Sequence, residues 1–71
     1  MSDQPLISII MNCHNGEKYL KDSIKSILDQ TYQNWELIFY DNNSNDKSKQ
    51  IFFEFRDKRL KYFYSQKTLK L

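Results

Sequence analysis

The sequence has few of the residues that cross-link small proteins or allow tight turns. It contains one cysteine, one glycine and one proline among 71 residues. A single cysteine cannot form an internal disulfide, so the chain must rely on a packed core, and this cysteine usage fits a reducing compartment. A single glycine also excludes the glycine-rich turns of dinucleotide-binding proteins and phosphate loops, because each of these turns needs more than one glycine.

Long apolar runs and a strong charge of one sign are missing as well. No apolar stretch approaches the roughly 20 residues of a membrane-spanning helix, and no basic region precedes the first apolar run, as it would in a signal peptide. The net charge of +2 is too small to argue for a nucleic-acid partner. Basic residues do gather in 57–71, where we expect a solvated edge, with an anion-facing surface as the alternative. They are Lys58, Arg59, Lys61, Lys67 and Lys70.

Hydrophobic periodicity divides the chain into alternating strands and helices. The expected elements are, in chain order, a strand at 5–11, a helix within 15–32, a strand at Trp35–Phe39, a helix within 47–55 and a strand at Leu60–Tyr64. The first run, "PLISIIM", is apolar apart from one serine, which is typical of a strand buried on both faces. Each helix carries one apolar stripe at helical spacing. The stripes are Leu20, Ile24, Ile27 and Leu28 in the first helix, and Ser48, Ile51, Phe52 and Phe55 in the second.

This β-α-β-α-β order predicts an α/β fold with a Rossmann-like parallel sheet, right-handed crossovers and three layers. The length allows one small domain, and we expect a single partial domain over 1–71, with its core at 5–64 and a frayed or truncated end at 65–71. In such sheets ligands bind at the carboxyl ends of the strands. The polar loops "NCHNGE" and "DNNSND" follow the first two strands, so both are expected at that edge.

Three interpretations compete for the second polar loop. A calcium loop of the EF-hand type is excluded, because the required glycine and glutamate are missing from positions 6 and 12. Helix capping would use Asn43 or Ser44 as the N-cap, with Asp46 favourable in the first turn. Capping leaves Asp41 and Asn42 unexplained, whereas a ligand-binding edge accounts for them.

The first polar loop is expected to begin a helix. Asn15 is the candidate N-cap, with Gly16 and Glu17 in the first turn. Cys13 and His14 are neighbours, and in a strand conformation their side chains would point to opposite faces, so they cannot form a catalytic pair. We expect Cys13 to be a small buried residue. His14 is expected either to stack on a ligand or to cover the end of the sheet.

The stretch "PLISIIMNCHNGEKYLKDSIKSILDQTYQNWELIFYDNNSNDKS" resembles the beginning of the family 2 glycosyltransferases, which are enzymes of the GT-A fold. Members usually have a strand ending in Pro-Thr-Tyr-Asn-Gly, a helix ending in Gln-Thr-Tyr, and a second strand ending in Asp-Asp-Gly-Ser-Thr-Asp. Here "NCHNG", "DQTYQNWE" and "DNNSND" stand at those places in the same order. The similarity runs from Pro5 to about Tyr64, and it identifies the chain as the first half of a GT-A nucleotide-sugar-binding domain.

The resemblance implies transfer of a sugar from a nucleotide-diphosphate sugar, foremost a UDP-sugar, to a glycan or a lipid-linked acceptor. It implies a cytoplasmic location, with peripheral contact to the inner membrane face as an alternative. By resemblance, the nucleotide-binding residues are Asn12, His14, Asp41 and Asn42. His14 replaces a tyrosine that can stack on the base, and Asn42 replaces an acid that reads the uracil edge. Because an amide offers both a donor and an acceptor, the base preference stays open.

The remaining machinery of the family is not matched. The Asp-x-Asp motif, which holds Mg²⁺ or Mn²⁺ on the diphosphate, and the catalytic base should both follow Tyr64. We therefore assign no catalytic residue, metal ligand or cofactor to this chain. Without the cation the leaving group lacks its Lewis acid. We expect nucleotide binding without sugar transfer by the chain alone, no nucleic-acid partner and no membrane span.

Two hypotheses from other classes remain. The chain could be a non-catalytic interaction module whose exposed third strand and apolar helix faces pair with a complementing chain or a second copy, because three parallel strands leave an edge and apolar faces uncovered. The weaker hypothesis is a small nucleic-acid binder that uses Lys58, Arg59 and Lys61 with the nearby tyrosines.

Overall fold

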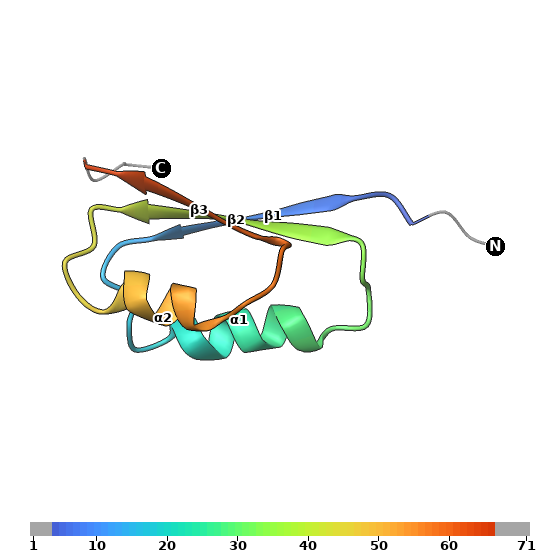
Figure 1. Ribbon diagram of the computed structural model, residues 1–71, viewed down its shortest axis with the longest axis horizontal. Coiled ribbons are helices and arrows are strands. Elements are labelled where there is room, and N and C mark those ends of the chain that lie inside the picture. The colour runs from blue at the N-terminus through green and yellow to red at the C-terminus, as the bar shows by residue number, and fades with distance from the viewer. Residues whose placement is uncertain (1–3, 67–71) are drawn as a thin grey trace.

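The computed structural model describes residues 4–66, whose elements follow the expected order (Figure 1). These elements are β1 (Ile7–Cys13), α1 (Leu20–Asp29), β2 (Trp35–Asn42), α2 (Ser48–Glu54) and β3 (Leu60–Ser65). The strands form one parallel sheet in the order β1-β2-β3. The predicted Rossmann-like α/β fold is therefore confirmed. Of the expected frayed or truncated end, Ser65 belongs to β3, while residues 67–71 lie outside the described residues.

The core lies between the sheet and the two helices. Alternate residues of β2 point toward the helices, because side chains of a strand alternate between its two faces. One of them, Phe39, stacks on Phe52 of α2 with ring centroids 4.7 Å apart. The predicted apolar stripes thus pack on the chain's own sheet and not on a partner, as the interaction-module hypothesis supposed. The buried apolar residues are Cys13, Leu20, Ile24, Trp35, Leu37, Phe39 and Phe52.

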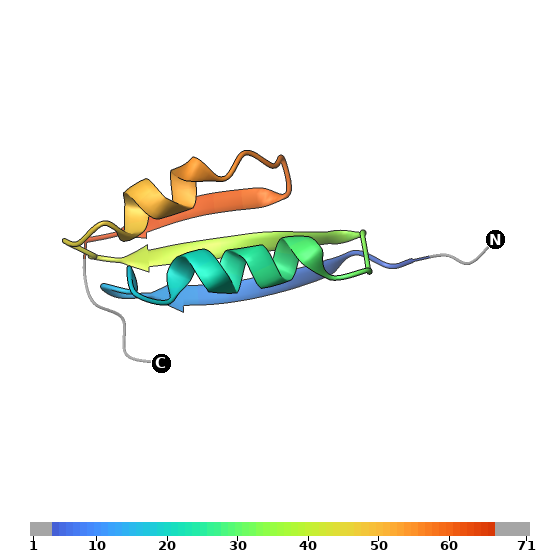
Figure 2. The ribbon, with the colours of Figure 1, turned by 90° about the horizontal axis from the view of Figure 1, so that it is seen from below.

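Two layers, and not the expected three, make up the described part of the chain. Both helices lie on the same side of the sheet (Figure 1), with α1 across β1 and β2 and α2 beside β3 (Figure 2). The two right-handed crossovers step across the sheet in the same direction, which brings their helices to the same face. The expectation that the first strand is buried on both faces is therefore wrong: Ile10 of β1 is 62% exposed. We call this uncovered side of the sheet the open face.

Candidate functional site

The carboxyl ends of β1 and β2 bring together the four residues that the resemblance selected. Asn12 is the exposed penultimate residue of β1, and the exposed His14 follows that strand. Asp41 and Asn42 are the last two residues of β2, which runs three residues beyond its expected end. The stretch "DNNSND" therefore begins in β2 and continues as a loop. Its first two residues stand beside the first polar loop, because Cys13 and Asp41 are paired in the sheet.

Hydrogen bonds between backbone and side chains join the two polar loops. The backbone N–H of Asn15 donates to Ser44 Oγ at 2.9 Å, and the N–H of Asn45 donates to Asn15 Oδ1 at 2.8 Å. The N–H of Gly16 donates to the fully buried Ser48 Oγ at 2.9 Å. We call this set of bonds between residues 15–17 and 44–48 the loop clasp. Most of the short polar side chains in this region are occupied in holding the two loops together.

Glu17 and Asp46 complete the loop clasp, and Asp46 also binds the first residue of the second helix. The N–H of Glu17 donates to Asp46 Oδ2, and the N–H of Lys47 donates to Glu17 Oε1, each at 3.1 Å. Asp46 Oδ1 accepts the N–H of Ser48 at 2.9 Å. Burial acts to raise the pKa of Asp46, but the hydrogen bonds from Ser48 and the Glu17 N–H lower it overall. Asp46 thus accepts the N–H of the first residue of α2.

The N-caps expected from the sequence are corrected by the structure. Asn43 has a φ of 54° and Asn15 a φ of 53°, so each lies in the left-handed region that asparagine tolerates better than most residues. Neither residue caps a helix: α1 begins only at Leu20, and α2 begins at Ser48. Ser44 accepts a hydrogen bond from the other loop and not from its own helix. These side chains bind across 29 or 30 positions of sequence, which local capping patterns do not anticipate.

Asp41 is fully buried, and both of its carboxylate oxygens have partners within the chain. Oδ1 accepts the N–H of Ser44 at 3.0 Å, and Oδ2 accepts the hydroxyl of Tyr62 at 2.5 Å. Burial, together with the hydrogen bond to Asp41, raises the pKa of Tyr62 well above its usual range. The sequence predicted only that Tyr62 belongs to the third strand. Its polar role follows from the pairing of β2 with β3, and no local pattern signals it.

Asn42 differs from Asp41 in having an unsatisfied atom. The residue is only 4% exposed, and its side-chain Oδ1 is buried without a hydrogen-bond partner. A buried acceptor without a partner costs about 1–3 kcal/mol. Such a group is rare in folded proteins, and it calls for a physical reason. An N–H donor supplied by a ligand would satisfy it.

His14 is held against the same residue. Its Nδ1 lies 2.6 Å from the backbone oxygen of Asn42. A carbonyl oxygen can only accept, so Nδ1 carries the hydrogen, and in the neutral ring Nε2 is an acceptor. The side-chain Nδ2 of Asn15 donates to Nε2 at 3.4 Å. The imidazole is thus fixed at the mouth of the site with an exposed surface, and it lies between the end of β2 and the loop clasp.

Metal binding is not supported by the donor set of the described residues. Within 4–66, no three His, Cys, Asp or Glu side chains gather closely enough to hold an ion. The oxygens of Asp41 and Asp46 are already engaged by hydrogen bonds. The residues present therefore do not fit the divalent cation that the resemblance implies. In the same range, no helix combines the length and the apolar character needed to cross a membrane.

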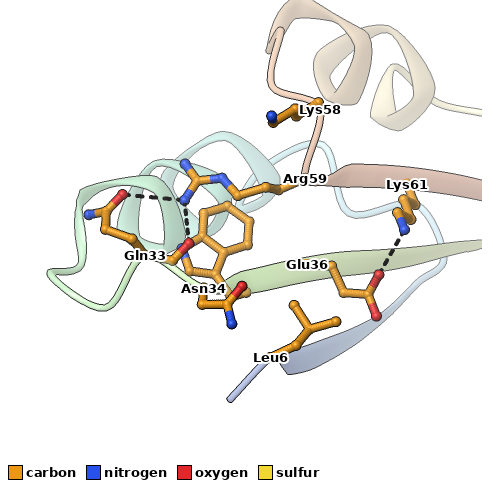
Figure 3. A pocket seen from close by; sticks show the side chains of 8 residues that line it. Leu6, Gln33, Asn34, Glu36, Lys58, Arg59 and Lys61 are labelled. Atoms are coloured by element: carbon orange, nitrogen blue, oxygen red, sulfur yellow. Dashed lines mark hydrogen bonds and ion pairs between the residues drawn. The ribbon is translucent and has the colours of Figure 1, made fainter. Parts of the chain in front are cut away.

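A cavity of about 410 Å³ lies at the opposite, amino-terminal edge of the sheet (Figure 3). Its basic side chains are largely paired inside the chain. Arg59 binds Asp57 at 2.8 Å and lies 3.9 Å from the ring centroid of Trp35. Lys61 binds Glu36 at 2.8 Å, and this hydrogen bond lowers the pKa of Glu36. These contacts weaken the nucleic-acid hypothesis, because paired cations are less available for phosphate. The lining residues are Leu6, Gln33, Asn34, Trp35, Glu36, Lys58, Arg59 and Lys61.

The fold and its polar carboxyl edge define an α/β protein of the Rossmann-like class, in which ligands bind at this edge. Residues 8–71 match the glycosyl transferase family 2 domain. The chain belongs to this family, so the resemblance found in the sequence is confirmed.

Three relatives illustrate the match. An uncharacterized glycosyltransferase of Haemophilus influenzae is 49% identical over 65 residues, covering 89% of this chain and 26% of the relative. The E. coli UDP-Glc:alpha-D-GlcNAc-diphosphoundecaprenol beta-1,3-glucosyltransferase WfgD is 46% identical over 59 residues, covering 83% and 23%. A third, the uncharacterized glycosyltransferase RT0329 of Rickettsia typhi, is 42% identical over 62 residues, covering 87% and 19%. The chain spans about a quarter or less of the length of these relatives.

Proposed function

We propose that this chain forms the nucleotide-binding part of a family 2 glycosyltransferase and receives a nucleotide-diphosphate sugar at the carboxyl edge of β1 and β2. The observation that carries this proposal is the buried side-chain Oδ1 of Asn42, which has no hydrogen-bond partner among the described residues. The backbone oxygen of the same residue lies 2.6 Å from Nδ1 of the exposed His14. The name of the E. coli relative specifies UDP-Glc as its donor. This name supports a UDP-sugar as the donor here and a lipid-linked acceptor for the complete enzyme.

Each residue of the site would have a distinct part in binding. Asn42 Oδ1 would accept an N–H of the base, which removes the cost of its missing partner. His14, whose ring is fixed by the Asn42 carbonyl, would pack on the base, and the exposed Asn12 lies beside it on β1. Asp41 acts as a positioning residue: its oxygens hold Ser44 and Tyr62, so it shapes the loop and does not point a free carboxylate at the ligand.

In the complete enzyme, the bond between the anomeric carbon and the diphosphate oxygen breaks, and the acceptor oxygen bonds to that carbon. The acceptor's proton passes to a base, and the nucleoside diphosphate leaves. The base and the Mg²⁺ or Mn²⁺ site are proposed to come from sequence following Tyr64 in the family pattern. We infer that residues 4–66 bind the donor nucleotide and do not transfer the sugar by themselves, because the family pattern places both the metal motif and the base beyond Tyr64.

Calorimetric titration of the purified chain with UDP, CDP, GDP and dTDP tests this function. One nucleotide should bind, and Asn42→Ala should weaken that binding about 5- to 150-fold, which corresponds to the about 1–3 kcal/mol of a buried polar group. The matched control is Asn34→Ala at the opposite edge of the sheet, which should leave binding unchanged. Failure of every nucleotide to bind a chain that circular dichroism shows to be folded would refute the proposal. Equal affinities of the two variants would also refute it.

A non-catalytic interaction module is the second candidate, and the exposed Ile10, Tyr40 and Phe63 of the open face favour it. The titration separates the two functions, because an interaction module would bind none of the four nucleotides and would still associate through its surface.

A further inference from the structure

Asn15 joins the loop clasp to the ring of His14 through the two ends of its side-chain amide. The backbone N–H of Asn45 lies 2.8 Å from Asn15 Oδ1, and His14 Nε2 lies 3.4 Å from Asn15 Nδ2. A backbone N–H can only donate, so the amide atom beside it is the oxygen. The amide atom that faces the ring is therefore the nitrogen, which can only donate.

Both ring nitrogens of His14 have fixed roles as a result. Nδ1 lies 2.6 Å from the backbone oxygen of Asn42, which can only accept, so Nδ1 carries a hydrogen. Nε2 faces an N–H of Asn15, so it is the acceptor of the ring. Each assignment depends on a backbone group whose role is unambiguous. The exposed ring therefore offers a ligand its faces and its C–H edge, and no hydrogen-bonding atom.

The backbone of Asn15 holds the amide in this place. Its φ is 53°, in the left-handed region that asparagine and aspartate tolerate better than most residues. Its N–H donates to Ser44 Oγ at 2.9 Å. Both Ser44 and Asn45 belong to the loop after β2, so this second loop orients the amide. The amide is thus turned toward the ring by contacts that need no ligand.

We propose that Asn15 is a positioning residue of the nucleotide site, whose amide engages Nε2 so that His14 meets the base with a ring face and with no hydrogen-bonding atom. This inference rests on the proposed nucleotide function and adds to it the way in which His14 recognises a base. Every base has a π-face, so such stacking accepts purines and pyrimidines alike. Discrimination among bases then falls to Asn42 Oδ1, which has no partner among residues 4–66.

Heteronuclear NMR of the ring nitrogens tests the positioning step without a ligand. His14 is the only histidine of the sequence, so its ring signals are identified directly. At about pH 8, where a histidine without partners is neutral, Nδ1 should carry a hydrogen and Nε2 none. Asn15→Asp keeps an acceptor for the Asn45 N–H and replaces the donor beside Nε2 by an oxygen. In this variant Nε2 should gain a hydrogen.

Asn43→Asp is the matched control for this variant. It makes the same change of side chain and charge at the other asparagine with a positive φ, 54°. The side chain of Asn43 binds Tyr64, so the ring spectrum of this control should equal that of the wild type. A wild-type ring with its hydrogen on Nε2 would overturn the proposal, and so would identical ring spectra of the two aspartate variants.

A second variant covers the case in which Asn15→Asp does not fold by circular dichroism. Asn15→Gly serves in its place, because glycine accepts a positive φ without strain. It removes the amide, so the Nε2 signal of His14 should shift toward that of an imidazole in water. An unchanged Nε2 signal in a folded Asn15→Gly chain would refute the contact between Asn15 and the ring.

A double-mutant cycle connects Asn15 with nucleotide binding. Calorimetry uses whichever of UDP, CDP, GDP and dTDP the wild type binds best. Asn15→Asp should weaken binding about 2- to 12-fold more than Asn43→Asp, which is the range of one hydrogen bond. His14→Ala should weaken binding about 5- to 150-fold, the range of one lost base stack. His14→Phe should recover most of that loss, because it keeps a flat ring, and in its background Asn15→Asp should cost no more than Asn43→Asp.

The outcomes separate this inference from the function on which it rests. If His14→Phe binds as poorly as His14→Ala, a ring nitrogen contacts the ligand, and the proposal is refuted while the nucleotide function stands. Equal costs of Asn15→Asp in the wild-type and His14→Phe backgrounds would show that Asn15 acts without the ring, which also refutes it. A folded wild-type chain that binds no nucleotide would refute the function itself, and the ring spectra would then decide only whether Asn15 orients the ring.

Discussion

Replacing Ser48 by alanine should weaken the loop clasp at its buried centre. The Ser48 hydroxyl is fully buried, and its oxygen accepts the N–H of Gly16 at 2.9 Å. Cys13 Sγ lies 3.7 Å from the same oxygen. Alanine fills most of the space of serine but offers no acceptor, so the Gly16 N–H stays buried without its partner. Because this N–H belongs to the other loop, its loss acts directly on the contact between the two loops.

The expected effect is large for a chain of this size. A buried donor without a partner costs about 1–3 kcal/mol. At about 0.05–0.15 kcal/mol per residue, a chain of this length has a free energy of unfolding of about 4–10 kcal/mol. A loss near 2 kcal/mol would therefore remove a fifth to a half of the total stability. It should lower Tm by roughly 8–16 °C, since each kcal/mol shifts Tm by about 4–8 °C in domains of this length.

Thermal and urea unfolding followed by circular dichroism measure this loss. The matched control is Ser26→Ala on the exposed surface of α1, where the hydroxyl donates to the Asp22 carbonyl at 3.0 Å. That variant should change stability by less than about 0.5 kcal/mol, because its partner remains open to water. If the Ser48 and Ser26 variants unfold at the same temperature, the Gly16 N–H must find another partner, and the structural role of the loop clasp is refuted.

The remaining predictions concern the surroundings of the loop clasp. Tyr62→Phe should lower the free energy of unfolding by about 1–3 kcal/mol, because buried Asp41 loses one of its partners; unchanged urea unfolding would contradict this. The raised pKa of Tyr62 means that the unfolded chain loses this proton at lower pH than the folded chain. The stability from this group is therefore complete below about pH 10 and declines above it, and Tyr62→Phe should lack that part of the alkaline decline. Gly16→Ala should destabilise by about 1–3 kcal/mol, because the added Cβ would lie 2.5 Å from the Tyr19 ring and 2.8 Å from Cys13 Sγ. Thermal unfolding at the wild-type temperature would mean that Tyr19 moves aside freely.

Local periodicity accounts for what could be predicted of the fold. The apolar stripes of the two helices depend only on residue spacing within one element, and both stripes face the core as expected. Cys13 is buried and His14 exposed, as the alternation of strand side chains required. The polar cluster was placed at the carboxyl edge because an alternating order of strands and helices leaves few topologies. That argument depends on chain order and needs no contact between distant residues.

The polar side chains of the edge were harder to assign. Asn43 and Ser44 have the chemistry of an N-cap, and the local sequence pattern predicts that role for them. In the structure, Ser44 and Asp46 bind N–H groups about 29 positions away, in the loop after β1. A polar side chain with several possible partners binds the one that lies nearest in the folded chain. Residues of the two loops come near each other only after the sheet has formed.

The sequence by itself determined the kind of elements, their order, the parallel sheet and the family, because these follow from residue spacing and from motifs in a fixed order. Only the tertiary structure decided which face of the sheet is covered, since both crossovers step in one direction and place α1 and α2 on the same side. It also decided that Asp41 is satisfied by Tyr62 while the Oδ1 of Asn42 is left without a partner. Both side chains are buried, but successive strand residues point to opposite faces, so these two neighbours meet different partners.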